Sequence, residues 1–352
     1  MQTEIIIIGQ GICGTFLSYY LKKAGVPFLV IDEERSNTAS KAAAGIINPI
    51  TGRRMVKTWM IDELMSFAKK AYTQIDRELG IHCIAETNII DFFPTPQMRN
   101  AYLKRFEEDP EYLMLPQNEN DLREHFNYDF GYGTIEPVLL ITINELLTAF
   151  RKKLLDEHLL IGKYFIIDEL KVSENKIQYE DITADKIIFC DGIESFSNPY
   201  FRNCPFAPNK GEVLIAEINE FPSTHIFKKG INIVPWKENL FWIGSSYQWE
   251  FSDNKTTESF RMQTESVLRT WIKTDLKIIE HFASVRPATL ERRPFVGFHP
   301  TYKNVGILNG TGTKGCSLAP FFANQLVDHI VNNSPLSAEA NINRFDKVLS
   351  RK

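Results

Sequence analysis

The sequence predicts an α/β protein with one domain built on a parallel sheet and a second, α+β domain built on an antiparallel sheet. Residues 4–32 predict the first domain, because they describe a buried strand, a helix and another buried strand within about 30 residues, the length of a βαβ unit. Residues 211–251 predict the second domain, because they hold several aromatic runs of alternating polarity that are typical of antiparallel strands.

Size, charge and composition agree with a folded protein of more than one domain. The chain has 352 residues, which at roughly 100–200 residues per domain allows two domains or three. Its hydrophobic content of 43% and aromatic content of 12% supply a large core and exclude wholesale disorder. With 40 Lys and Arg residues against 44 Asp and Glu residues, the net charge of −4 argues against a chain-wide basic surface for nucleic acid.

Neither a membrane span nor a secretion signal is expected. No apolar run approaches the roughly 18 residues of a spanning helix, and the N-terminal MQTE lacks the basic and apolar regions of a signal peptide. The five cysteines are odd in number and form no CxxC pair, which argues against a disulfide framework or a zinc site. The seven histidines form no HExxH pattern, so we expect no metal site, and the cytoplasm is the simplest compartment.

The N-terminal elements follow one another in the order strand, helix, strand. Residues 4–8 form a β-branched apolar run before a glycine, which predicts a fully buried parallel strand. Residues 14–23 carry apolar side chains at helical spacing, and Gly25 ends that helix. Residues 27–32 (PFLVID) then predict a second buried strand that ends in an acid.

The rest of the chain adds helices and strands of both kinds. Helices are predicted where apolar residues recur every three or four positions, over 57–80, 142–155, 256–273 and 317–331. Buried strands are predicted at 186–190 and 305–308, and a glycine-rich turn follows the second of them. Residues 85–135 are mixed and rich in Pro, Asn and acids, and we predict no element there.

A GxGxxG motif joins the first strand to the first helix. Gly9 permits the tight turn, Gly11 lets the backbone approach a pyrophosphate, and Gly14 lets helix and strand pack closely. The helix that begins near Ile12 presents unpaired N–H groups and a positive dipole to the phosphates. Because strand, helix, second strand and terminal acid all agree, the motif predicts a Rossmann-type dinucleotide-binding domain.

The segment after the second strand favours FAD over NAD. Asp32, with Glu33 next to it, follows Gly11 by 21 residues, close to the roughly 20 expected for the acid that accepts from ribose hydroxyls. An acid there disfavours NADP, because a 2′-phosphate would meet a carboxylate. Residues 36–50 form a loop of small residues, which suits close packing over a bulky ring. The cofactor contacts expected from this loop are Ser40, Ala44 and Gly45.

Several further motifs, in order along the chain, make a family resemblance specific. They are TASKAAAGIINP at 38–49, KGEVL at 210–214, VRPAT at 285–289, PFVG at 294–297, GTGTKG at 310–315 and LAP at 318–320. In this order they resemble the D-amino-acid oxidase and glycine oxidase superfamily of FAD-dependent oxidoreductases. The matches extend from residue 5 to residue 330, so the resemblance covers nearly the whole chain.

The resemblance implies two interleaved domains. The FAD-binding domain would comprise residues 1–54, 137–205 and 284–352, so that the last residues of the chain close the domain that the first residues begin. The α+β substrate domain would comprise residues 55–136 and 206–283, including the aromatic antiparallel sheet.

The resemblance also points to Arg286 as the group that binds the substrate. The family that the chain resembles has its carboxylate-binding arginine in this RP motif. A guanidinium binds a carboxylate through two parallel hydrogen bonds. Of the nearby Arg292 and Arg293, at least one is expected to be a surface charge. Tyr247 is a candidate for the flavin face or for a hydroxyl contact to the substrate, with ordinary sheet packing as the alternative.

The glycine-rich turn before the last helix is the other candidate site. In the family this turn borders the flavin, where a helix dipole stabilises negative charge on the reduced ring. Lys314 would add positive charge there, or else be a solvated loop lysine. No cysteine lies in residues 283–298, and Cys316 follows the turn, so we expect non-covalent FAD. The cofactor contacts expected in this turn are Gly310, Gly312, Thr313, Lys314 and Gly315. Gly192, just after the predicted strand at 186–190, is a further expected contact.

The implied reaction is oxidation of a small amine or amino acid, by hydride transfer to flavin N5, to an imine that water hydrolyses. Oxygen or another acceptor would take the electrons, with Lys57 and Lys210 as candidate charges near the flavin. Two alternatives stay open: a flavin oxidase acting on a modified wobble uridine of tRNA, against which the net charge of −4 counts, and a non-catalytic flavoprotein subunit. An NAD-dependent enzyme conflicts with the C-terminal motifs.

Overall fold

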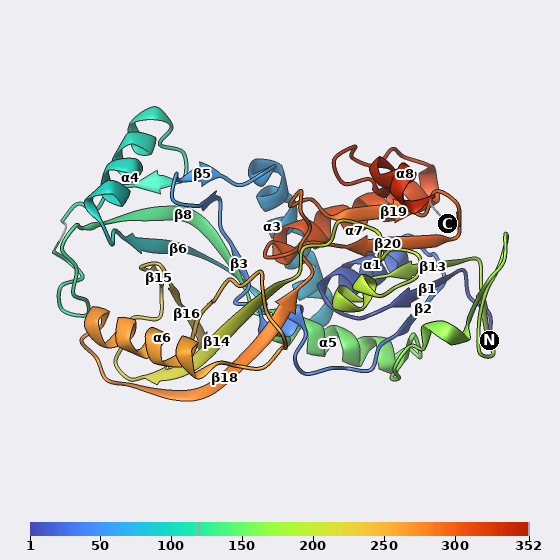
Figure 1. Ribbon diagram of the computed structural model, residues 1–352, viewed down its shortest axis with the longest axis horizontal. Helices are drawn as coiled ribbons and strands as arrows, with labels where there is room; N and C mark the ends of the chain where they lie inside the picture. Colours follow the sequence, from blue (N-terminus) through green and yellow to red (C-terminus); the bar gives the residue numbers. More distant parts are fainter. Residues whose placement is uncertain (119, 351–352) are drawn as a thin grey trace.

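The computed structural model describes residues 1–118 and 120–350 and contains two large sheets that lie side by side (Figure 1). The first is six-stranded, with all neighbours parallel except the antiparallel edge pair β19–β20. Its strands in spatial order are β19 (Phe295–Phe298), β20 (Val305–Asn309), β13 (Lys186–Phe189), β1 (Ile5–Ile8), β2 (Phe28–Ile31) and β9 (Leu160–Ile161). The β-branched runs of β1 and β2 are fully buried, as a parallel sheet covered on both faces requires.

Different layers cover the two faces of this sheet. Ile5 and Ile7 belong to a core shared with helices, whereas Ile6 and Ile8 belong to a core on the opposite face, since side chains alternate along a strand. The helices of the first core are α1 (Ile12–Lys23), α3 (Ile61–Leu79), α5 (Ile143–Asp156) and α7 (Gly315–Asn332). The second core lies under an antiparallel sheet of β10 (Leu170–Val172), β11 (Ile177–Tyr179) and β12 (Ile182–Ala184).

The second large sheet has nine strands and is antiparallel except for the parallel pair β15–β6. Aromatic side chains fill the core between it and α6 (Glu258–Trp271). Its path runs β18 (Leu276–Arg286), β14 (Asn209–Ile218), β17 (Leu240–Gly244), β16 (Asn232–Lys237), β15 (Ile226–Lys228), β6 (Ile84–Phe92), β8 (Tyr132–Ile141) and β3 (Ile46–Ile47), with β7 (Leu113–Met114) also paired to β8.

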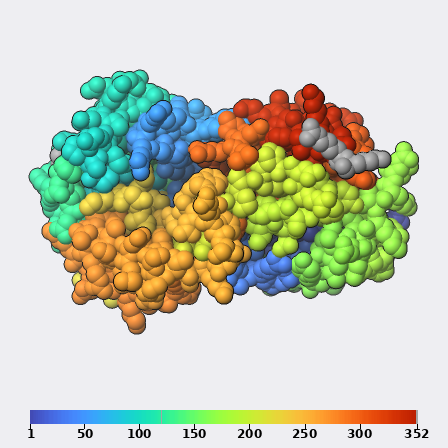
Figure 2. All heavy atoms as spheres, in the orientation of Figure 1, coloured from blue at the N-terminus to red at the C-terminus, as the bar shows by residue number. Residues whose placement is uncertain are grey.

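Further elements complete the described chain. They are α2 (Ala39–Ala42), the hairpin β4 (Ile50–Thr51) and β5 (Val56–Lys57), α4 (Pro96–Glu108), η1 (Ile167–Glu169), η2 (Gly192–Phe196), η3 (Ile342–Phe345) and α8 (Asp346–Leu349). In Figure 2 the half around the six-stranded sheet shows green, lime and red segments, and the other half shows cyan, gold and orange ones. Segments from distant parts of the sequence therefore build each half.

The predicted fold class is confirmed, and the predicted elements differ from the observed ones mainly at their ends. The helix predicted over 57–80 begins at Ile61, because residues 56–57 form β5. The segment 85–135, left without a prediction, contains α4, β7, most of β6 and the start of β8. Because β3 and β8 join the nine-stranded sheet, the predicted domain ranges divide that sheet at 54 and 137, and these ranges stay a prediction.

Within residues 1–118 and 120–350, no helix is both long and apolar enough to cross a membrane. The same residues contain no group of three or more His, Cys, Asp or Glu side chains arranged to hold a metal ion.

Candidate active site

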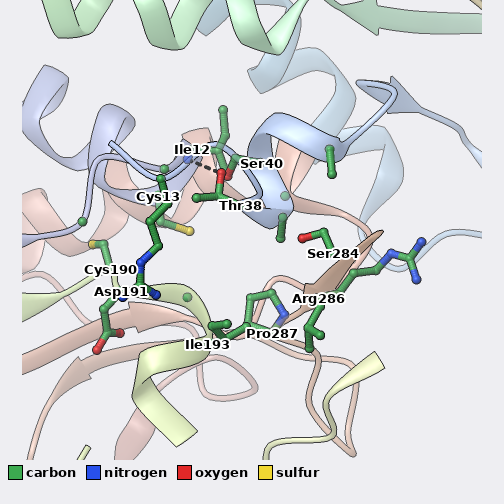
Figure 3. Close-up of a pocket in the computed structure, with 18 of the residues that line it drawn as sticks. Ile12, Cys13, Thr38, Ser40, Cys190, Asp191, Ile193, Ser284, Arg286 and Pro287 are labelled. Carbon is green, nitrogen blue, oxygen red and sulfur yellow. Dashed lines mark hydrogen bonds between the residues drawn. The ribbon is translucent and has the colours of Figure 1, made fainter. Parts of the chain in front are cut away.

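A cavity of about 400 Å³ lies between the two large sheets, and both sheets contribute to its wall. The parallel sheet contributes the β1–α1 turn and the ends of β2 and β13, and the antiparallel sheet contributes parts of β14, β17 and β18. Figure 3 shows the labelled residues around an open centre, with Ile12 and Ser40 on one side, Asp191 on another and Arg286 at the far end.

The β1–α1 turn forms one wall of the cavity. Two of its glycines lie where a side chain would collide with backbone atoms. Gly9 has φ +95°, and a Cβ there would lie 2.6 Å from the carbonyl oxygen of Cys190. A Cβ at Gly14 would lie 1.9 Å from the carbonyl oxygen of Gly9, so helix and strand approach as closely as the sequence predicted. The Ile12 N–H donates to Ser40 Oγ at 3.0 Å, which ties the small-residue loop to the start of α1 (Figure 3).

Asp32 lies at the end of β2 with a network around its carboxylate. It accepts from the backbone N–H of Gln10 at 2.8 Å and of Glu34 at 2.8 Å. Its Oδ1 also accepts from Arg151 Nη1 at 2.6 Å, and the Arg151 side chain is 8% exposed. These donors fix the orientation of a carboxylate that still faces the cavity.

Most of the predicted cofactor contacts do lie on the cavity wall. They are Gly9, Gly11, Ile12, Asp32, Glu33, Ser40, Ala44, Gly45, Gly192, Gly312, Thr313 and Gly315. Gly14 and Gly310 lie behind the wall, where their lack of a side chain permits close packing: a Cβ at Gly310 would lie 2.7 Å from Thr289 Cγ2. Glu33 forms an ion pair with Arg35, which also pairs with Glu194.

Arg286 lies at the end of β18 and opens on the same cavity. Its Nη1 donates to Asn209 Oδ1 and its Nη2 to Ser245 Oγ, both at 2.6 Å, and both nitrogens lie within 3.4 Å of the Ser246 carbonyl oxygen. Gly211 makes room for the guanidinium, because a Cβ there would lie 1.9 Å from Nη2.

The guanidinium of Arg286 is a positive charge held by neutral acceptors. Among the described residues, no carboxylate lies within the 4.0 Å of an ion pair with it. Burial lowers the pKa of Arg286, although a guanidinium remains charged at any physiological pH. A half-buried cation with only neutral partners can bind an anionic ligand without displacing a carboxylate.

The structure places a tryptophan on the cavity wall and the predicted aromatic residue, Tyr247, away from it. Trp242 of β17 lines the cavity and donates from Nε1 to the Ala42 carbonyl oxygen at 3.0 Å. Tyr247 lies outside the cavity wall and is 51% exposed, with its ring centroid 5.5 Å from the Arg286 guanidinium carbon.

The lysines proposed from the sequence lie off the cavity wall. Lys314 sits at the start of α7 between the wall residues Thr313 and Gly315, and burial, followed by the charges of Arg293 and Arg292, lowers its pKa. Lys57 pairs with Asp62 and Glu111 at the surface. Lys210 is buried in β14, 3.9 Å from both Glu212 and Asp253.

Of the adjacent Arg292 and Arg293, at least one was expected to be a surface charge, and Arg292 is one. Arg292 is exposed, whereas the Arg293 guanidinium carbon lies 3.9 Å from the ring centroid of Trp59 and its Nε donates to Glu339 at 3.2 Å. Neither residue lines the cavity.

Sequence reasoning missed several wall residues. Trp242 and Ser284 come from the antiparallel sheet and Ser245 directly follows β17, and only the pairing of β14 with β17 and β18 brings them to the cavity. Asp191 was detectable in principle, because it directly follows a predicted buried strand whose carboxyl end faces the glycine turn. Cys13, Cys190 and Cys316 also line the cavity as free, buried thiols.

The wall residues fit an FAD molecule. A Cβ at Gly11 would come within 3.1 Å of Ser40 Oγ, so the bare backbone leaves space beside the first N–H groups of α1, where a pyrophosphate binds. The first turn of α1 carries no acidic side chain, and Asp32 presents a carboxylate for a ribose. This combination defines a dinucleotide-binding protein of Rossmann type.

The comparisons place that fold in a family. The chain belongs to the FAD dependent oxidoreductase (DAO) family, whose model matches residues 4–329. The glycine oxidase of Pseudomonas aeruginosa is 21% identical over 356 residues, with 96% of this chain and 97% of that protein covered. The resemblance inferred from the motifs is therefore confirmed, and the protein is an FAD-dependent oxidoreductase.

Solved structures show the same fold at low identity. Glycine oxidase from Bacillus cereus superposes with a TM-score of 0.81 at 16% identity, covering 99% of both chains. Iminodiacetate oxidase from Chelativorans superposes with a TM-score of 0.77 at 17% identity, covering 96% of this chain and 98% of that one.

Proposed function

We propose that the protein oxidises the carbon–nitrogen single bond of an amine or amino acid whose carboxylate binds Arg286. The observation that carries this proposal is the Arg286 guanidinium, which opens on the FAD cavity and has only neutral partners among the described residues. The names of the relatives, which include glycine oxidase and iminodiacetate oxidase, support a substrate that combines an amine with a carboxylate.

The roles of the chain's own residues follow from their positions. The glycine turn, Ser40 and Asp32 hold the pyrophosphate and ribose, and Trp242 lines the cavity while donating to the Ala42 carbonyl oxygen of the small-residue loop. Arg286 orients the substrate carboxylate by its positive charge and by hydrogen bonds that replace its two long ones to the Ser246 carbonyl oxygen, and the α-carbon and nitrogen stay free to face the cofactor. When bound, FAD supplies the acceptor for the hydride that the α-carbon loses.

No described side chain need remove a proton if the amine binds in its neutral form. Loss of the hydride leaves the substrate as a protonated imine, and water hydrolyses it to a carbonyl compound and ammonium or a protonated amine. Orientation and the positive field of Arg286 supply the catalytic effect. Oxygen or another small acceptor then takes the electrons. The five cysteines are all unpaired, which supports the cytoplasm as the compartment in which the protein works.

The experiment is anaerobic reduction of the flavin by amino acids, N-methyl amino acids and 2-hydroxy acids, followed by absorbance. We expect bleaching by an amino-acid class only. Arg286→Ala should lower kcat/KM for the reactive substrate at least about 100-fold through KM, and Arg286→Lys should recover part of the loss. An unchanged kcat/KM in Arg286→Ala, or bleaching by 2-hydroxy acids alone, would contradict the proposal.

A further inference from the structure

Next to Arg286, strand β14 presents no charged side chain. Arg286 pairs with Asn209 in the register of β14 and β18, and the next residue on that face is Gly211, beside the guanidinium. Because side chains alternate along a strand, Lys210 and Glu212 point to the opposite face of β14. The guanidinium therefore has an amide and a glycine as its neighbours on this strand.

The charges on the opposite face of β14 are engaged there. The carboxylate of Glu212 is fully buried and accepts from the Thr257 N–H at 2.6 Å and from His281 Nε2 at 3.0 Å. Lys210 Nζ lies 3.9 Å from Glu212 Oε1. These contacts keep the nearest carboxylate of β14 away from Arg286, so the positive charge of the guanidinium is not neutralised from this strand.

Asn209 holds the guanidinium through its amide oxygen. Its Oδ1 accepts from Arg286 Nη1 at 2.6 Å, and the residue is fully buried. The other end of the amide, Nδ2, is also buried and has no hydrogen-bond partner among the described residues. Because an unpaired buried N–H donor costs stability, hydrogen bonding within the fold does not explain why this side chain is an amide.

A carboxylate at the position of Asn209 would be the closer structural partner of an arginine. Aspartate has the shape of asparagine and brings no N–H donor that would stay unpaired. It would also form a charge-assisted hydrogen bond with Nη1, which is stronger than a hydrogen bond to an amide. Its negative charge would cancel the positive charge of the guanidinium, however, and a substrate carboxylate would then meet a neutral pair.

We propose that Asn209 is a positioning residue that determines specificity, because its neutral amide orients Arg286 and leaves the positive charge of the guanidinium to the substrate carboxylate. This inference rests on the proposed function, which takes Arg286 as the carboxylate site. Asn209 lies off the cavity wall and acts only through Arg286. The residue at position 209 thereby decides whether the site binds an anionic substrate or a neutral one.

The test titrates the oxidised, FAD-loaded protein with acetate, which lacks an amine and binds without turnover, and follows the flavin absorbance. We expect Asn209→Asp to weaken acetate binding at least about 30-fold, because Arg286 then has a counter-ion of its own. Asn209→Ala removes the same hydrogen bond without adding a charge, so it should weaken binding less than about fivefold. The matched control is Asn304→Asp, which places a carboxylate at another buried asparagine, off the cavity wall, and should leave acetate binding unchanged.

Two further measurements distinguish this role from a structural one. With the reactive substrate, Asn209→Asp should raise KM while kcat changes less than about threefold, because residue 209 does not touch the reacting atoms. Its melting temperature should equal or exceed that of wild type, because the half-buried guanidinium of Arg286 gains a charged partner. A structural role of Asn209 predicts instead a lower melting temperature and an equal loss of binding in the Asp and Ala variants.

The outcomes separate this inference from the proposed function. The role of Asn209 is wrong, while the carboxylate site stands, if Arg286→Ala binds acetate weakly but Asn209→Asp binds it no more weakly than Asn209→Ala does. A melting temperature of Asn209→Asp below that of wild type also contradicts the role of Asn209. If Arg286→Ala binds acetate as tightly as wild type does, the carboxylate binds elsewhere and the proposed function itself is wrong.

Discussion

At the scale of single residues, the cavity wall contains a carboxyl group in an unusual environment. Asp191 follows β13, and its Oδ1 accepts from Ser195 Oγ and from Asn309 Nδ2. Both partners are neutral. Burial raises the pKa of Asp191 to about 7, the hydrogen bonds from Ser195 and Asn198 oppose that rise, and the charge of Glu194 adds to it.

This environment predicts how stability depends on pH. The folded-state pKa of Asp191 lies above its unfolded value of about 3.8, so the folded chain binds the proton more tightly. Its contribution to stability is therefore present at low pH, declines as the pH rises toward 7 and stays lost above that.

Asp191→Asn keeps an acceptor for Ser195 and removes the charge. We expect it to raise the melting temperature by a few degrees at pH 8, on the order of 2 kcal/mol, and to raise it by less than half as much at pH 5. Thermal unfolding followed by circular dichroism at both values checks this, and an equal effect at the two values would contradict it.

At the scale of elements, the β1–α1 unit positions the site through contacts too close for any side chain. The Cys190 carbonyl oxygen leaves no room for a Cβ at Gly9, and the Gly9 carbonyl oxygen leaves none at Gly14. Strands β1 and β13 pair in parallel and end at the same edge of the sheet. Helix α1 also packs extensively on α7, whose start carries the second glycine turn. Both turns are thereby held against one cavity.

A substitution at Gly14 tests this packing. Gly14→Ala should destabilise the fold by at least about 2 kcal/mol and lower FAD content, because its Cβ would meet a backbone oxygen that cannot move aside. Gly162→Ala is the matched control, since the nearest atom to its Cβ would be Arg151 Nη2 at 3.7 Å. Melting temperature and bound flavin measure both variants; equal behaviour of the two would count against the close-packing argument.

At the scale of the whole molecule, the cavity exists only because two sheets meet. One sheet supplies the glycine turn and Asp32, the proposed phosphate and ribose contacts, and the other supplies Trp242, Ser284 and Arg286. The cavity also contains three buried thiols. Burial raises the pKa of Cys13 to about 12 and that of Cys316 likewise to about 12, so neither is a thiolate at neutral pH.

Protonated thiols are poor nucleophiles, and we therefore expect FAD to be held without a covalent bond. Acid precipitation of the purified protein should release the flavin into the supernatant and leave a colourless pellet. A yellow pellet, with flavin fluorescence on a denaturing gel, would show a covalent link and contradict this prediction.

The sequence by itself determined the local parts of this protein. Gly9, Gly11 and Asp32 were identifiable because a tight turn, a close approach and a strand-end acid each constrain a short stretch of chain. The order of motifs up to Arg286 and the last helix was enough to indicate the family, which the comparison confirmed.

Only the tertiary structure decided which side chains share the cavity with those local motifs. Trp242 faces it and Tyr247 does not, because β17 pairs with β14 up to Gly244 and the chain then leaves the strand. The neutral surroundings of Arg286 and the burial of Asp191 depend on strands that are distant in sequence. Such contacts arise from strand pairing and packing between sheets, and no short stretch of sequence encodes them.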